Sequence, residues 1–403
     1  MMATMLAFAY LRRRWGQALL SILVGALGIA AVSTAFVGFD ALPEAAERSW
    51  GGVDLVVGPK GSALDLVLCC ALHVADPQGL VSQKAAMAVA RHPLVRVAAP
   101  IALGDNVEGW RIVGTTPDLL KVYRATLARG TIWDKPLQAV LGARAANALH
   151  LKLGDHFIGA HGLAAGGEMH SQFPYTVVGV LAPTGSALDR LVLCDIETVR
   201  LIHRAHAAEE AAETGIAENT VNLPDAATAV VVSYKSPVAA MLMPRLVNAS
   251  PELSAGSPTF EIARLMSYLR PLTVAVTALG LLLVAIAAAG AAAGLMATMN
   301  ARTRDLALLR ALGATPAAVA LVAFAEAAII ALAALALGSA LTWLFLTLAE
   351  NALLDRTGLL LKPVIDMGDV FRLIGFTFLV AFLAALVPSI RASHASIEEL
   401  LQS

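Results

Sequence analysis

Three of the nine histidines lie close together in a glycine-rich stretch between residues 155 and 170. They are His156, His161 and His170, and the carboxylate of Glu168 lies among them. Imidazole and carboxylate groups are common ligands of zinc and copper, so these four side chains could close around one such ion. Their spacing matches no standard metal-binding motif, and the alternative is that they are ordinary surface residues of a loop. The stretch is therefore a candidate zinc or copper site with both interpretations open.

The rest of the sequence offers few groups for catalysis. His203 and His206 are spaced i and i+3 on an expected helix, and the same two interpretations apply to them. No GxxxxGK[ST] phosphate loop is present, and the glycines between Gly58 and Ser62 have the wrong spacing for one. A GxSxG nucleophile elbow is also missing. We therefore expect no enzymatic activity from this chain itself.

Composition points to a membrane protein. Of the 403 residues, 58% are hydrophobic and only 15% are charged, whereas charged residues make up roughly a quarter of an ordinary soluble domain. The mean hydropathy is +0.72. A formal net charge of −1 argues against a basic surface for nucleic acid, so no nucleic-acid partner is expected.

The cysteines are too few for a disulfide scaffold. Cys69, Cys70 and Cys194 lack the spacing of a zinc finger or a CxxC motif. We expect three free, buried thiols, and the alternative is one bridge from Cys194 to either neighbour.

Four apolar stretches are long enough to cross a bilayer, and they define the membrane segments. They are residues 17–39, 271–298, 315–349 and 373–390. The first could instead belong to a signal peptide, but its apolar run is longer than such peptides carry. With four spans, the arginine clusters beside the spans all fall on one side, which the positive-inside rule assigns to the cytoplasm. Both termini are then cytoplasmic.

Residues 40–269 have the character of a folded domain outside the membrane. Short β-branched runs at 54–61, 110–114, 175–181 and 229–234 predict strands. Helical stretches are expected at 82–91, 118–124, 142–149 and 196–207. Residues 208–225, rich in glutamate, are expected to form an exposed loop or a poorly ordered insert. This alternation predicts an α+β domain.

A short basic helix follows the second apolar stretch. Its leucines recur at helical spacing, Gly313 suits the residue that closes a helix, and the charges lie between the leucines. The residues expected to make contacts are Arg302, Arg304, Asp305, Leu306, Leu309, Arg310 and Gly313. Positive-inside topology alone would also explain the arginines, without any partner.

The segment from Arg304 to Ala314 resembles the cytoplasmic loop of FtsX-like permeases, the MacB- and Lol-type membrane subunits of ABC transporters. Asp305 stands where that family usually has glutamate. The resemblance covers nearly the whole chain, since one span, a large external domain and three further spans also form the family's layout. It implies that the basic helix docks on a separate cytoplasmic ATPase, which binds ATP and Mg²⁺, and that the permease pairs with a second copy or a paralogue.

Glu326 is an ionisable residue within the third apolar stretch. Such groups are costly in a membrane and usually face a protein interior or a cavity. It could act as a switch or a proton site, and the alternative is a role in packing alone.

The predicted fold is an α-helical membrane protein with four transmembrane helices and a large extracytoplasmic α+β domain inserted between the first two. The expected segments are 1–39 (cytoplasmic segment and first span), 40–269 (external domain), 270–299 (second span), 300–315 (coupling helix), 316–349 (third span), 350–370 (external loop), 371–391 (fourth span) and 392–403 (cytoplasmic tail).

The predicted function is that of an ABC transporter permease in a bacterial inner membrane, which converts ATP hydrolysis by its partner into motion of its periplasmic domain. Membrane lipids and a periplasmic binding protein are further expected partners. The alternative is a membrane-anchored, periplasmic metal-binding or sensing protein that uses the histidine-rich stretch.

Overall fold

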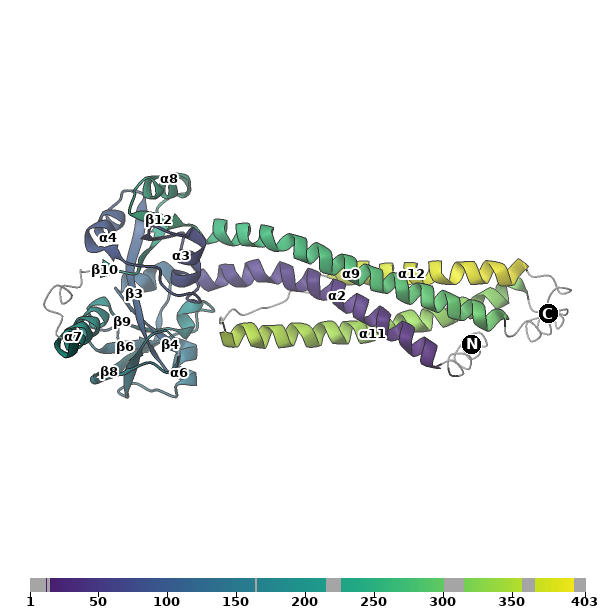
Figure 1. Ribbon diagram of the computed structural model, residues 1–403, viewed down its shortest axis with the longest axis horizontal. Helices are drawn as coiled ribbons and strands as arrows, with labels where there is room; N and C mark the ends of the chain where they lie inside the picture. Colours follow the sequence, from purple (N-terminus) through teal and green to yellow (C-terminus); the bar gives the residue numbers. More distant parts are fainter. Residues whose placement is uncertain are drawn as a thin grey trace. The chain divides into compact units, whose positions relative to one another are not determined.

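The computed structural model describes residues 12, 15–163, 165–214, 226–300, 315–356 and 367–394. These residues form two compact units, a domain built around residues 43–268 and a helical unit that contains residues 1–42, 269–351 and 362–403. Figure 1 labels the strands and helices of both units.

The domain is built on one large mixed sheet of ten strands. Its order is β12-β1-β11-β3-β4-β9-β6-β8-β5, and β7 pairs with β3 and β8. A separate two-stranded sheet joins β10 to β2. The strands are β1 (Leu55–Pro59), β2 (Val81–Ser82), β3 (Val95–Val107), β4 (Trp110–Thr115), β5 (Leu127–Gly130), β6 (Gln138–Leu141), β7 (His156–His161), β8 (Met169–Leu181), β9 (Val192–Asp195), β10 (Ala226–Ala227), β11 (Ala229–Tyr234) and β12 (Leu253–Gly256).

Short helices connect the strands and cover the sheet. They are α3 (Ala63–Cys70), α4 (Gln83–Ala90), α5 (Asp118–Tyr123), α6 (Ala143–Ala148), the 3-10 turn η1 (Ala187–Arg190), α7 (Ile196–Thr214) and α8 (Pro237–Asn248). Local sequence explains several helix starts, because the hydroxyls of Ser62 and Ser82 accept hydrogen bonds from backbone N–H groups in the first turns of α3 and α4. The expected strands and helices are present at these places.

The core of the domain lies on both faces of its central strands. In β11, the side chains of Ala229 to Ser233 are all buried, which is the pattern of a strand covered on both sides. Tyr175, Ile101, Ile112 and Leu193 are among the largest fully buried side chains. Cys69, Cys70 and Cys194 are buried and free, so the prediction of three unbridged thiols is confirmed.

The helical unit consists of long apolar helices. They are α2 (Trp15–Trp50), α9 (Pro258–Asn300), α11 (Pro316–Arg356) and α12 (Met367–His394). Within the described residues, three stretches are long and apolar enough to cross a membrane: Trp15–Trp50, Pro258–Ala297 and Ala320–Leu354. The apolar part of α12, Val370–Leu386, is shorter. The fourth crossing therefore stays a prediction.

Small residues let the long helices approach closely. A Cβ atom on Gly28 of α2 would lie 2.7 Å from the carbonyl oxygen of Gly280 in α9, and a Cβ on Gly280 would lie 2.9 Å from the carbonyl oxygen of Gly28. A Cβ atom on Gly338 of α11 would lie 2.8 Å from the side-chain Cγ2 of Ile29 in α2 and 3.0 Å from the carbonyl oxygen of Ala26. Such contacts between small residues are how membrane helices pack without a hydrophobic driving force between them.

Two expectations about segment ends were wrong. Residues 208–214, expected to form a loop, continue α7 as far as Thr214, because alanine and glutamate favour the helix. Residues 350–356, expected in an external loop, continue α11 to Arg356. The rest of both expected loops, residues 215–225 and 357–366, lies outside the described residues.

Candidate functional site

A buried aspartate with three histidines around it is the most concentrated group of ligating side chains in the described part of the domain. Asp105 belongs to β3, His161 ends β7, His170 lies near the start of β8 and His203 comes from α7. The Oδ1 atom of Asp105 lies 3.3 Å from Nε2 of His170, 3.3 Å from Nε2 of His203 and 3.8 Å from Nδ1 of His161.

The Asp105 carboxylate is fully buried, and its second oxygen, Oδ2, has no hydrogen-bond partner among the described residues. A buried carboxylate oxygen without a partner is costly, because water has been removed and nothing replaces it. Such an atom is informative in an otherwise well-paired domain, since a buried carboxylate oxygen of this kind is one that a cation can pair.

A bulge in β3 aims Asp105 at the histidines. The pairing register between β3 and β4 shifts between Leu103 and Asp105, so Gly104 is the extra residue. A Cβ atom at Gly104 would lie 2.3 Å from Cε1 of His203. Only glycine leaves room for the His203 ring at this position, so the bulge both turns Asp105 and admits its neighbour.

The β7–β8 hairpin is held against β3 by backbone hydrogen bonds and one amide side chain. Asn106 donates from Nδ2 to the carbonyl oxygens of Ala160 (3.3 Å) and Gly162 (3.0 Å). The backbone N–H of Gly162 donates to the carbonyl oxygen of Gly104 at 2.7 Å. These bonds position His161 independently of any ligand.

The structure brings together only two of the four residues expected to bind metal. His161 and His170 flank Asp105, whereas His156 lies at the other end of β7 and its Nδ1 is 3.0 Å from the hydroxyl of Thr176. Glu168 is exposed, and its carbonyl oxygen accepts a hydrogen bond from the backbone N–H of His161. The stretch is a hairpin of β7 and β8 with a turn between them, not a single loop.

Asp105 and His203 complete the group, and sequence reasoning did not place them there. His203 was noted only for its spacing to His206, whose side chain lies outside the described residues. The sequence does contain a signal for Asp105, because this acidic residue interrupts a strand of mostly apolar residues. A charge in such a strand needs a partner, which the sequence alone does not identify.

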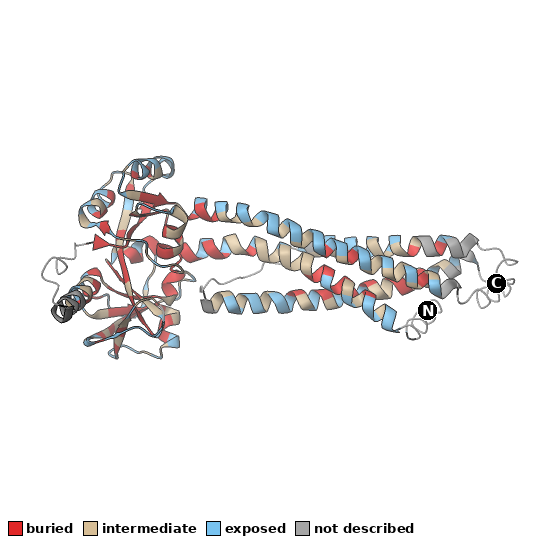
Figure 2. Cartoon of the chain, viewed as in Figure 1, coloured by how far each residue is buried: buried red, intermediate tan, exposed pale blue. Residues whose placement is uncertain are grey.

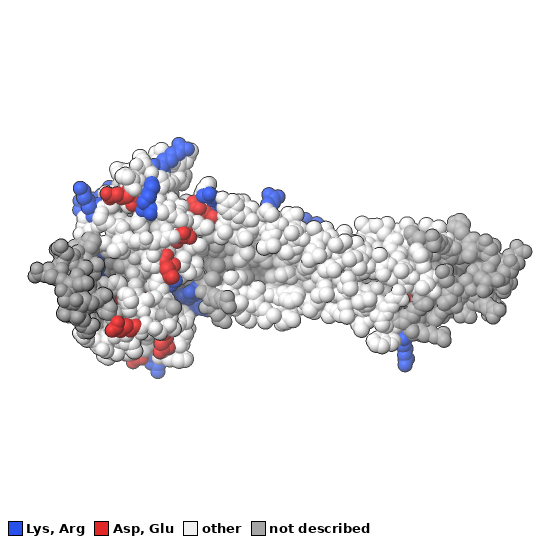
Figure 3. All heavy atoms as spheres, viewed as in Figure 1, with Lys and Arg blue, Asp and Glu red and all other residues white. Residues whose placement is uncertain are grey.

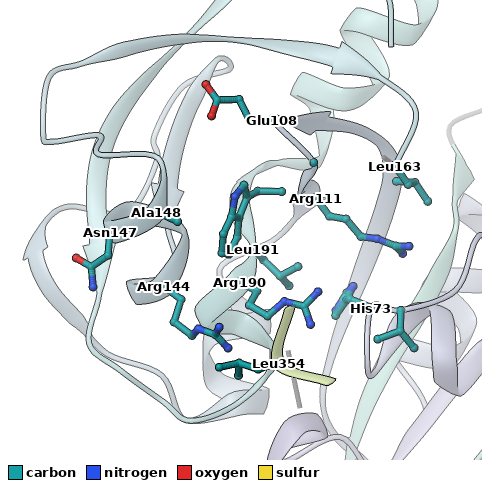
Figure 4. A pocket seen from close by; sticks show the side chains of 13 residues that line it. His73, Glu108, Arg111, Arg144, Asn147, Ala148, Leu163, Arg190, Leu191 and Leu354 are labelled. Carbon is teal, nitrogen blue, oxygen red and sulfur yellow. The ribbon is translucent and has the colours of Figure 1, made fainter. Parts of the chain in front are cut away.

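A second polar feature of the domain is a basic hollow. Arg111, Arg144 and Arg190 lie along it together with His73 (Figure 4). Burial lowers the pKa of Arg190 to about 10, and the positive charges of Arg144 and Arg111 add to that effect. Crowded cations of this kind can attract an anionic group.

His73 is the most perturbed titratable group of this hollow. Its imidazole is buried, and its Nδ1 atom has no hydrogen-bond partner among the described residues. Burial first, and then the charges of Arg111 and Arg190, lower the pKa of His73 to about 3. The ring is therefore neutral at physiological pH.

The remaining expected site residues are not placed by the described structure. The coupling-helix residues Arg302, Arg304, Asp305, Leu306, Leu309, Arg310 and Gly313 lie outside the described residues. Glu326 lies in α11 and is buried within the helical unit, at 9% exposure. This burial agrees with an interior position and leaves both interpretations of Glu326 open.

Charge separates the two units clearly. Figure 3 shows acidic and basic side chains over the domain, whereas the visible face of the long helices is mostly uncharged. The helices instead expose large apolar side chains, such as Leu272, Leu282, Leu332 and Phe382. Such a surface suits contact with lipid.

Among solved structures, the chain is similar to the periplasmic region of MacB from Actinobacillus actinomycetemcomitans, at 13% identity and a TM-score of 0.34, over 54% of this chain and 94% of that one. It is also similar to the extracellular domain of the noncanonic ABC-type transporter YknZ from Gram-positive bacteria, at 12% identity and a TM-score of 0.31, over 50% of this chain and 98% of that one. No curated protein sequence matches.

Two family models match different parts of the chain. Residues 18–242 match the MacB-like periplasmic core domain, and residues 277–397 match the C-terminal region of FtsX-like permeases. The first match alone covers more than half of the 403 residues. The resemblance noted in the sequence is thereby confirmed, and this protein belongs to the FtsX-like permeases of ABC transporters that carry a MacB-like periplasmic core domain.

Proposed function

We propose that this protein transmits force: a separate cytoplasmic ATPase pushes on the segment around residues 302–313, and the push moves the periplasmic domain. In this scheme the chain crosses a bacterial inner membrane four times, with both termini in the cytoplasm. ATP and Mg²⁺ bind only to the partner. Two permease copies, or one copy and a paralogue, form the membrane part of the transporter.

The continuity of α9 is the observation that carries this proposal. α9 is one helix of 43 residues, from Pro258 to Asn300, which corresponds to roughly 65 Å at 1.5 Å per residue. Its first turns belong to the domain, where Ile262 is buried in the core and Leu265 packs against it. Its later turns form a candidate membrane span that ends immediately before the basic segment. A helix is stiff along its axis, so displacement at one end can reach the other.

A second helix makes the same connection. α2 runs from Trp15 to Trp50, and its last turns contribute Ala46 and Trp50 to the domain core. Each connecting helix has one proline in its interior, Pro43 in α2 and Pro271 in α9. Proline removes one backbone hydrogen bond of the helix and favours bending there. Both helices could therefore bend near these prolines when the domain moves.

Topology is tested first by labelling introduced cysteines with a membrane-impermeant maleimide in intact cells. The three native cysteines are buried, so they give little background. We expect Glu168→Cys, on the exposed β7–β8 turn, to react from outside and Thr303→Cys to react only after the membrane is permeabilised. Labelling of both from the same side would overturn the proposal.

Coupling is tested by reversing charge in the basic segment. The affinity-tagged chain is purified from its native host with the ABC ATPase that accompanies it, identified by mass spectrometry. We expect the double variant Arg304→Glu, Arg310→Glu to recover at least tenfold less ATPase and to stimulate ATP hydrolysis at least tenfold less than the wild type. The matched control reverses two exposed charges of the domain, Arg129 and Lys152, and should keep wild-type ATPase binding and wild-type stimulation. Wild-type ATPase binding by the first variant, or no ATPase with the wild type, would contradict the scheme.

The alternative of a metal-binding or sensing protein rests on the histidines of the domain. It does not compete with force transmission for the same residues, because the basic segment and the histidine group are separate parts of the chain.

A further inference from the structure

We propose that Asp105, His161 and His203 form a binding site for a transition-metal dication of the zinc type, and that the buried His170 orients the Asp105 carboxylate. This inference concerns the domain alone and stands whether or not the proposed force transmission is correct.

The distances between the donor atoms fit such an ion. One oxygen of Asp105 and one ring nitrogen each of His161 and His203 all lie within 4.8 Å of one another. Zinc binds histidine nitrogen at roughly 2.0–2.1 Å in tetrahedral geometry, which places neighbouring ligand atoms about 3.3 Å apart. The separations of Asp105 Oδ1 from His203 and His161, 3.3 and 3.8 Å, leave only a small adjustment for binding.

The buried carboxylate supplies an independent reason for a cation. Asp105 is completely buried, and its Oδ2 atom is without a hydrogen-bond partner in the described structure. A metal ion bound by both oxygens of the Asp105 carboxylate would pair Oδ2 as well as Oδ1 and would neutralise the charge. Neutral histidines that only donate to Oδ1 would leave Oδ2 unsatisfied.

The four side chains differ in exposure in a way that assigns their roles. The side chain of His170 is only 5% exposed, whereas those of His161 and His203 are 50% and 30% exposed. His161 and His203 therefore form an open mouth through which an ion can enter, with a further position for water. The buried His170 has its Nε2 atom 3.3 Å from Oδ1 of Asp105, where it can hold the carboxylate by a hydrogen bond, as partners of metal ligands commonly do.

The donor types select the class of ion. Two imidazoles and one carboxylate suit zinc, copper and related transition metals, whereas magnesium and calcium prefer oxygen ligands throughout. Occupation of the site would also join α7 to the β7–β8 hairpin, because His203 and His161 come from these two elements. Metal would then stiffen this corner of the domain.

The test measures zinc binding to the full-length chain in detergent micelles. A chelator first removes bound metal, and Zn²⁺ or Mg²⁺ is then added. We expect the wild type to retain one Zn²⁺ per chain after gel filtration and to bind no Mg²⁺. His161→Ala and His203→Ala should each weaken Zn²⁺ binding at least tenfold in competition with a chromogenic chelator. His170→Gln should weaken it by about tenfold, because it removes only the partner of a ligand.

His156→Ala is the matched control, since His156 lies on the same strand as His161 but outside the group. It should bind Zn²⁺ as the wild type does. Equal binding by the wild type and by the double variant His161→Ala, His203→Ala would overturn the proposal, and so would a wild type that retains no zinc. Loss of binding in the His156→Ala control would move the site elsewhere and likewise contradict it.

A measurement on the wild type alone guards against variants that fail to fold. Co²⁺ in a tetrahedral site absorbs visible light much more strongly than hexaaqua Co²⁺, so its spectrum reports the geometry directly. We expect a tetrahedral or five-coordinate spectrum that Zn²⁺ abolishes by displacement, together with a rise in melting temperature on adding Zn²⁺. A spectrum identical to that of aqueous Co²⁺ would contradict the proposed site.

Discussion

The domain and the helical unit use opposite means to hold their elements together. In the domain, large side chains such as Tyr175 and Ile112 are fully buried around the sheet. In the helical unit, glycine and alanine occupy many of the buried contacts, while many leucine and phenylalanine side chains are exposed. Figure 2 shows that exposed and half-buried residues predominate along these helices. Water drives the burial of apolar groups in the domain, but lipid gives no such drive, so the helices depend on close backbone approach.

Polar groups follow the same division. The domain buries Asp105, Asn106 and Asp189 and gives each a polar partner from another part of the chain: Asp105 faces histidines, Asn106 donates to the carbonyl oxygen of Ala160, and Asp189 accepts from the backbone N–H of Thr184. In the helical unit, buried hydroxyls such as Thr342 and Ser389 bond to carbonyl oxygens four residues earlier in their own helix. Specific chemistry is therefore concentrated in the domain, and the helices provide length and contact. Three predictions test this contrast.

The largest effect is expected at the contact between α2 and α9. Gly28→Leu places a side chain where even a Cβ atom would lie 2.7 Å from a backbone carbonyl oxygen. The helices must separate, at a cost on the order of 3–5 kcal/mol of unfolding free energy. Thermal unfolding in detergent, followed by tryptophan fluorescence, measures this. Gly16→Leu on the same helix is the control, since no atom lies within 4 Å of a Cβ there. Equal loss in both variants would argue that close packing at Gly28 does not hold the helices.

A smaller loss is expected when one buried carboxylate of the domain is removed. Asp189 accepts hydrogen bonds from the backbone N–H groups of Thr184 and Gly185 and from the hydroxyl of Thr184, each at 2.8 Å. Asp189→Ala leaves these donors without an acceptor, and we expect a loss of about 2–4 kcal/mol. Chemical denaturation of the full chain provides the measurement.

Asp118→Ala is the comparison for that variant. Asp118 pairs with Lys121 at 2.7 Å, but both side chains are largely exposed. An exposed pair contributes roughly 0–1 kcal/mol. If the two substitutions cost the same, burial of the Asp189 carboxylate contributes nothing special to the domain.

The smallest effect concerns pH. The pKa of buried His73 is about 3, below the value of about 6.5 for histidine in an unfolded chain. Between these two pH values the unfolded chain binds more protons than the folded chain. The stability that neutral His73 contributes is therefore fully present well above pH 6.5 and decreases as the pH falls toward 3. At pH 5 the loss is on the order of 2 kcal/mol.

His73→Asn tests this pH effect. The backbone of His73 has a positive φ of 55°, a conformation that asparagine tolerates well. We expect the variant to lose less stability than the wild type between pH 7 and pH 5, as measured by denaturant midpoints at both values. An identical pH dependence in both proteins would show that His73 is not the group responsible.

Local patterns account for much of what the sequence predicted correctly. An uncharged run such as 271–298 predicts a membrane helix because its length and apolarity are properties of one segment. The strand at 229–234 is likewise marked by consecutive β-branched residues. The segment ends were less predictable: α7 and α11 both continue past the expected boundary, because helix-forming residues extend beyond the apolar pattern.

The candidate metal site shows where such reasoning stops. His161 and His170 were identified because they lie close in sequence, and the hairpin keeps them close in space. Asp105 is 65 positions from His170 and 98 from His203, so only the pairing of β3 with β7 and the packing of α7 bring them together. His156 was included for its sequence proximity, although it lies at the opposite end of its strand.

The sequence by itself determined the three long apolar helices, the class of the domain and the family, since these depend on composition, periodicity and motifs within short segments. Tertiary structure alone decided which side chains meet at Asp105 and which glycines lie between helices. The physical reason is range: a helix or strand is selected by interactions among neighbours in the chain, whereas a site or a helix contact depends on how strands pair and elements pack.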